Sequence, residues 1–83
     1  MRTIVLAVAT LAVVSPALAD RPVTPREYSA ISWAIGAHGC KGGRYEFDQD
    51  DHRYEVDDAR CANGREYDFE LDPWFRITKK KRD

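Results

Sequence analysis

Residues 42–71 read GGRYEFDQDDHRYEVDDARCANGREYDFEL, and apolar and polar side chains alternate along most of this stretch. A period of two is typical of strands that bury one face and leave the other in water. The same period continues to residue 77. The apolar positions fall into four sets: Tyr45 and Phe47; Tyr54 and Val56; Tyr67, Phe69 and Leu71; Phe75 and Ile77. The pattern predicts four antiparallel strands.

Short clusters of turn-forming residues separate these strands. They are residues 49–52, 62–64 and 72–74, which read QDDH, ANG and DPW. Asn63-Gly64 is the most specific of these signals, because both residues tolerate the positive φ that a tight hairpin requires. The clusters predict hairpins between successive strands.

The alternation breaks once, at Asp57-Asp58 in the second predicted strand. After the break, Cys61 is out of phase with Val56. A β-bulge adds one residue to a strand and turns the side chains that follow it. We expect a bulge here to direct Cys61 toward Cys40.

A helix is predicted before the strands. Thr24 is typical of an N-cap, Pro25 of the first helical position, and Glu27 completes a capping box. The helix should run from Pro25 to about Ala37 and end at residues 38–39. The sequence thus predicts an α+β fold, with one N-terminal helix packed on a four-stranded antiparallel β-sheet and a single disulfide.

One aromatic residue lies off the apolar stripe of this helix. Tyr28, Ile31 and Ile35 share one side, whereas Trp33 lies about 140° around the helix from Tyr28. Trp33 either covers the edge of the core or contacts a partner, for which an exposed tryptophan is a favoured anchor.

The N-terminus has the features of a cleavable secretory signal peptide. A positive start at Arg2 precedes the apolar run 4–14, and residues 17–19, ALA, form a cleavage site. The run is much shorter than the ~20 residues of a membrane-spanning helix. We therefore expect residues 1–19 to be removed, with no stable membrane insertion afterwards. Residues 20–83 should form one exported domain with a short basic C-terminal tail.

Cys40 and Cys61 are the only cysteines. In an exported chain such a pair is typical of a disulfide, and no C-x-x-C motif supports the alternatives of a redox pair or a metal site. A core this small is marginal. Closing the loop between the two residues would contribute ~3 kcal/mol to stability.

Three segments resemble small periplasmic proteins of the PepSY-like superfamily: residues 39–43 (GCKGG), 54–61 (YEVDDARC) and 63–72 (NGREYDFELD). The resemblance covers the chain from about Thr24 to Lys79. It implies an α+β unit of the kind found in protease propeptides, a periplasmic or secreted location, and a role in binding or restraining peptidases. The resemblance transfers no catalytic residues.

The charged residues allow two interpretations. The chain has 13 basic and 14 acidic residues, which does not support non-specific nucleic-acid binding. The acidic residues of the strands should lie on the wet face of the sheet, either simply solvated or steering a basic partner surface. The candidate partner surface consists of Trp33, Trp74, Glu55, Glu66, Asp68 and Glu70.

Catalytic and metal chemistry find little support in the sequence. Asp48, Asp50 and Asp51 are a weak candidate for a hard cation, because the calcium-binding EF-hand frame is absent around them. No Ser or Cys has a His and an acid in a recognisable local frame. We expect no enzymatic activity and no cofactor.

Two hypotheses of function follow. The first is an exported, non-enzymatic PepSY-like binding module whose partner is a protein or peptide in the cell envelope, such as a peptidase that it restrains or inhibits. The alternative is a small structural or cation-associated envelope protein acting through its acidic turn.

Overall fold

The computed structural model describes residues 20–83, and the predicted signal peptide lies outside this range. The described chain folds into one helix and six strands: β1 (Arg21–Pro22), α1 (Pro25–Gly36), β2 (Cys40–Lys41), β3 (Arg44–Asp48), β4 (Arg53–Cys61), β5 (Glu66–Leu71) and β6 (Ile77–Arg82). The α+β class and the single helix are confirmed. The number of strands is not.

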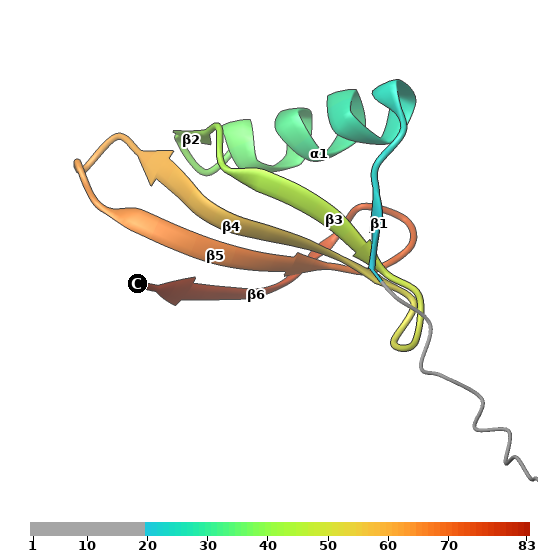
Figure 1. Ribbon diagram of the computed structural model, residues 1–83. Helices are drawn as coiled ribbons and strands as arrows, with labels where there is room; N and C mark the ends of the chain where they lie inside the picture. Colours follow the sequence, from blue (N-terminus) through green and yellow to red (C-terminus); the bar gives the residue numbers. More distant parts are fainter. Residues whose placement is uncertain (1–19) are drawn as a thin grey trace, which may run out of the picture.

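All strands belong to one antiparallel sheet, in the order β1-β3-β4-β5-β6, with β2 paired to the end of β4 (Figure 1). The four predicted strands correspond to β3 through β6. The prediction of four was wrong because β1 and β2 also pair with the sheet. Each is two residues long, so neither has a hydrophobic period that a sequence pattern could reveal.

The last strand also begins later than predicted. Phe75, expected in the strand, lies in the preceding turn with φ of 65°. The carboxylate of Asp72 holds this turn by accepting hydrogen bonds from the backbone N–H groups of Trp74 and Arg76. The prediction of a basic tail at residues 79–82 was also wrong, because these residues pair with β5 and belong to β6.

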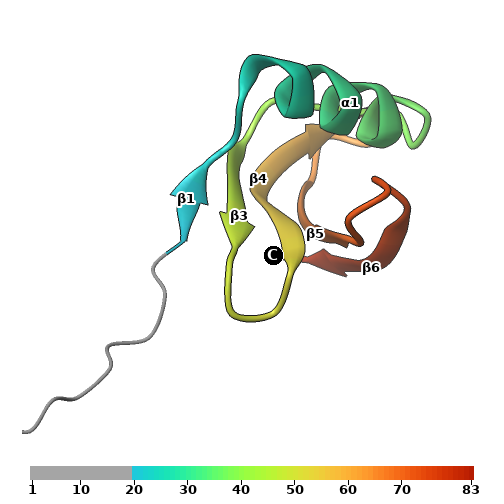
Figure 2. The ribbon, with the colours of Figure 1, turned by 90° about the vertical axis from the view of Figure 1, so that its right-hand side faces the viewer.

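The core lies between α1 and one face of the sheet. Figure 1 shows α1 running along that face, and Figure 2 shows the sheet curling beneath it. Burying one large apolar side chain, such as isoleucine or phenylalanine, contributes about 1.5–3 kcal/mol to the stability of the fold. The fully buried side chains are Ile31 and Ile35 from the helix and Val56, Phe69 and Leu71 from the sheet.

The predicted start of the helix is confirmed in detail. The Thr24 hydroxyl accepts a hydrogen bond from the N–H of Glu27, and the Glu27 carboxylate accepts one from the N–H of Thr24. The same carboxylate accepts two bonds from the Arg21 guanidinium and one from the Tyr54 hydroxyl. Glu27 therefore joins β1, α1 and β4.

The predicted bulge is also confirmed. The register of β4 against β5 shifts between Val56 and Ala59, and Asp58 has φ of 63°. Gly43 packs against this bulge: a Cβ on it would lie 2.6 Å from the carbonyl oxygen of Asp57. Beyond the bulge, Cys61 lies opposite Cys40, and the two form the predicted disulfide.

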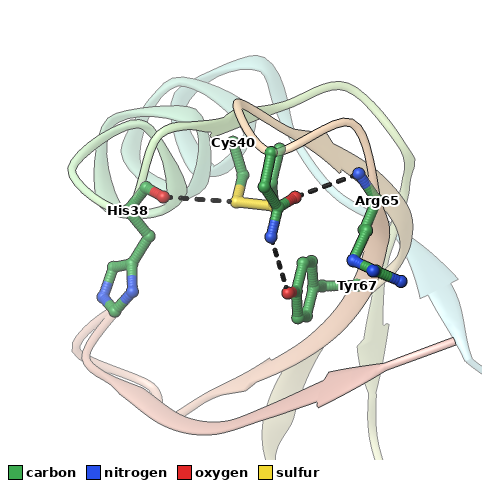
Figure 3. The surroundings of a disulfide bond; sticks show 6 residues. His38, Cys40, Arg65 and Tyr67 are labelled. Carbon is green, nitrogen blue, oxygen red and sulfur yellow. Dashed lines mark hydrogen bonds between the residues drawn. A yellow bond between two sulfur atoms is a disulfide. The ribbon is translucent and has the colours of Figure 1, made fainter.

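The hairpin beside the disulfide differs from the prediction in one respect. Gly64 has φ of 82°, but Asn63 does not have a positive φ. Instead, the Asn63 side chain accepts a hydrogen bond from the N–H of Arg65 and donates one to the Tyr67 hydroxyl (Figure 3). Asn63 thus stabilises the turn through its side chain.

Candidate functional site

Trp33 projects from the outer side of α1. It is two residues from each of the buried Ile31 and Ile35, which at 100° per residue places it on the opposite side of the helix. Its side chain is 84% exposed, and it is not among the residues that pack against the core. The interpretation that Trp33 covers the edge of the core is therefore wrong.

Small residues surround the Trp33 indole. Ser32, Gly36 and Ala37 line a shallow depression with it. The Ser32 hydroxyl is 3.0 Å from the Tyr45 hydroxyl, with which it forms a hydrogen bond, so it is directed toward the sheet. Neither Gly36 nor Ala37 can cover an indole ring. The indole is left accessible to an incoming surface.

Tyr28 is a second aromatic side chain on α1, nearer the N-terminus of the helix than Trp33. Tyr28 is 49% exposed and stacks on Tyr45, with 4.6 Å between the ring centroids. Tyr28 therefore contributes to the packing of α1 on β3 as well as to the surface. It is partly held in place by the sheet, whereas Trp33 is not.

Trp74, the other tryptophan of the predicted surface, belongs to a different element. It lies in the turn between β5 and β6 and is 73% exposed. The Arg76 guanidinium lies 5.5 Å from its ring centroid, and Arg76 is also paired with Asp72 at 2.7 Å. The two tryptophans are thus presented by α1 and by a turn, not by one element.

Three glutamates form a row across the face of the sheet that points away from α1. Glu46 on β3 lies opposite Glu55 on β4, which lies opposite Glu70 on β5. Arg53 relieves the repulsion, since it contacts Glu55 at 3.3 Å and Glu70 at 3.7 Å. Partial burial raises the pKa of Glu55.

The hollow on this face mixes acids and lysines. It has a volume of about 180 Å³, and its lining residues are Glu55, Asp57, Asp68, Phe69, Glu70, Lys79 and Lys81. Three of the four predicted surface acids therefore gather here, on the opposite side of the sheet from Trp33. The fourth, Glu66, lies apart and pairs with Arg60 at 3.0 Å.

The aspartates around the turn between β3 and β4 already take part in hydrogen bonds and ion pairs within the same segment. The Asp48 carboxylate accepts hydrogen bonds from the N–H groups of Asp50 and Asp51. Arg53 contacts Asp51 at 3.4 Å and Asp48 at 4.0 Å. Binding of a cation by these carboxylates stays a prediction, and it would have to compete with Arg53.

Two other groups of carboxylates come together only through the fold. In each, oxygens from three residues lie within 4.8 Å of one another, close enough to contact one cation. The two groups are Asp20, Glu46 and Glu55, and Asp58, Asp68 and Asp83. Hydrogen bonding to Asp58 raises the pKa of Asp83 to about 7. Their members are far apart in the sequence, on different strands or directly beside a strand end, so no local sequence pattern indicated them.

No helix within residues 20–83 is long and apolar enough to span a membrane. Comparisons with models of protein families, with curated proteins and with solved structures gave no match. The fold and surfaces define the chain as a small, disulfide-bonded α+β domain with an exposed tryptophan on its helix.

Proposed function

We propose that this protein is an exported, non-enzymatic, PepSY-like binding module that docks a peptidase of the cell envelope through the outer side of α1. The exposure of Trp33 carries the proposal. A tryptophan buries about 150–250 Å² when it is covered. At ~25 cal/mol per Å² this corresponds to roughly 4–6 kcal/mol as an upper limit, so one such anchor can dominate an interface.

The surroundings of Trp33 support an interface. The small side chains beside it let a partner approach the helix closely. The indole is not needed for the core, so its position on the surface does not follow from folding alone. A partner with an apolar pocket that can receive the ring fits this geometry best.

The reactive side chains support a role without catalysis. Within the described part of the chain, both thiols are in the disulfide, and the Ser32 hydroxyl is bonded to Tyr45. The hollows in the same range are shallow and open to solvent. Export rests on the N-terminal sequence, and the disulfide is of the kind found outside the cytoplasm.

The test is capture from an envelope extract with the purified, oxidised protein and two variants. Trp33→Ala removes the proposed anchor, whereas Trp74→Ala removes a similarly exposed indole from another element and is the matched control. The expected result is a peptidase recovered by the wild type and by Trp74→Ala but not by Trp33→Ala. The wild type, and not Trp33→Ala, should then slow cleavage of a reporter peptide by that enzyme.

Two outcomes would contradict the proposal: capture that both variants retain, or no peptidase among the captured proteins. Because Trp33 is outside the core, Trp33→Ala should melt at the wild-type temperature. The structural or cation-associated alternative predicts instead that calcium raises the melting temperature, since a ligand of the folded state stabilises it.

A further inference from the structure

Within residues 20–83, β6 forms one edge of the sheet and pairs only with β5 (Figure 1). Its register is regular over four successive pairs, from Lys79 opposite Glu70 to Arg82 opposite Tyr67. Residues 78–82 are all exposed. Every second N–H and C=O group of an edge strand points away from the sheet, ready to pair with another strand.

Basic side chains lie on both sides of this edge. Lys79 and Lys81 line the hollow on the face away from α1. Lys80 lies on the other face, with its ammonium 4.6 Å from the Tyr67 ring centroid. Among residues 20–83, none of the four residues from Lys79 to Arg82 forms an ion pair with an acid.

We propose that the free edge of β6 binds an extended, acidic segment of a partner protein as an added strand. Side chains of such a segment would alternate between the two faces, as those of β6 do. Its carboxylates would therefore meet lysines on both sides, while its backbone pairs with the free N–H and C=O groups.

The arrangement of charge favours this partner over an anionic membrane. A flat membrane would contact one side of the strand only. On the side of Lys79 and Lys81 it would also meet the acids of the hollow, including Asp57 and Glu70. An added strand would lie two strand spacings, about 10 Å, from the acids of β5, which exceeds the Debye length of about 8 Å at physiological salt.

The same lysines exclude other strands. A lysine-rich edge protects a sheet from pairing with another neutral or basic edge. A second copy of β6 would bring like charges together, so self-pairing is disfavoured. The β6 edge therefore favours pairing with an acidic strand. The opposite edge of the sheet offers fewer backbone groups for pairing, because β1 has two residues and Pro22 has no N–H to donate.

The proposal is tested by titrating the purified, oxidised protein with a synthetic eight-residue peptide of alternating glutamate and valine. The comparison peptides are the same sequence N-methylated at every residue, which removes the backbone donors of both edges but keeps the charge, and a lysine–valine peptide. We expect only the unmethylated acidic peptide to bind, with shifts of the amide resonances of residues 78–82. Equal binding of the methylated peptide, or no binding, would overturn the proposal.

Variants distinguish binding at the β6 edge from binding at the Trp33 surface. Lys79→Gln with Lys81→Gln should weaken binding about tenfold, whereas Lys41→Gln, an exposed lysine of β2, should not. Trp33→Ala should bind the peptide like the wild type, so failure of either proposal is distinguishable from failure of the other. Melting curves check that the double variant is folded. Vesicles of phosphatidylglycerol that bind more tightly than the peptide would overturn the proposal in favour of a membrane contact.

Discussion

Among single residues, Glu27 does more than complete the capping box of α1, because it also bonds to residues outside the helix. Its carboxylate accepts four hydrogen bonds at 2.6 to 2.9 Å, from Arg21, Thr24 and Tyr54. These donors, the Arg21 guanidinium first, hold the pKa of Glu27 well below its usual range. Burial, with the bond to Glu27, raises the pKa of Tyr54 to about 12.

Glu27→Gln should lower the free energy of unfolding by about 1–2 kcal/mol at neutral pH, because the amide cannot accept all four bonds as a charged group does. A group with a depressed pKa in the folded state stabilises the fold above its ordinary pKa and loses that effect as the pH falls. Urea unfolding from pH 7 to pH 2 should therefore show a steeper loss below about pH 4.5 for the wild type than for the variant. Parallel curves would contradict the assigned role.

Gly43 and Gly42 offer a matched pair of backbone substitutions. Both have positive φ, 97° and 75°, but only Gly43 is in contact with the β4 bulge. Gly42→Ala should cost about 1–2 kcal/mol for the left-handed backbone alone. Gly43→Ala should cost clearly more, because its Cβ would meet the Asp57 carbonyl. Thermal melting of both variants measures the difference, and equal losses would show that the bulge adjusts freely.

At the scale of elements, the end of β6 is linked to the bulge by three carboxylates. Asp58 lies in the bulge, Asp68 on β5, and Asp83 directly follows β6. A protonated carboxyl can bridge this group, whereas three ionised ones repel each other. Lys81 lies opposite Asp68 in the pairing of β5 with β6.

This arrangement predicts a dependence on pH between about 4 and 7. The folded pKa of Asp83, about 7, is above its ordinary value of 3.8. Its stabilising contribution is therefore fully present below the ordinary value and is lost as the pH rises through 7. The melting temperature of Asp83→Asn should vary less over this window than that of the wild type. Glu66→Gln, at the same end of the sheet, should keep the wild-type profile.

The elements that the sequence predicted well are those whose signals are local. Thr24, Pro25 and Glu27 mark the helix start by their types and spacing, and alternation marks β3, β4 and β5. The bulge at Asp57-Asp58 was also visible as a break in that alternation. The local pattern failed in the last strand, where Phe75 lies in a turn and residues 79–82 pair with β5.

Features that depend on pairing across the fold were not predictable in this way. β1 forms only because Glu27 and β3 hold Arg21 and Pro22 in place. The acids of the predicted surface could be placed on the wet face, but not sorted into the hollow and the separate Glu66, because that depends on register. For Trp33, the periodicity predicted its side of the helix, but its exposure depends on the rest of the fold, because no other element within residues 20–83 covers that side of α1.

At the scale of the whole molecule, the disulfide joins β2, the short strand that follows α1, to the end of β4. Reduction should lower stability by about 3 kcal/mol, because the unfolded chain regains the freedom of a loop with a sequence separation of 21 residues. Melting with and without reductant measures this effect, and the double variant Cys40→Ser with Cys61→Ser should resemble the reduced protein. Identical melting in both conditions would contradict a structural role.

The position of the disulfide also decides what one cut in the backbone can do. The exposed turn at residues 50–52 lies within the ring that Cys40 and Cys61 close. If a peptidase cleaves there, the two fragments stay covalently joined, with α1 on one and β5 and β6 on the other. β3 and β4 remain hydrogen-bonded across the gap. One cut in this turn would thus leave the two fragments of the domain joined by the disulfide.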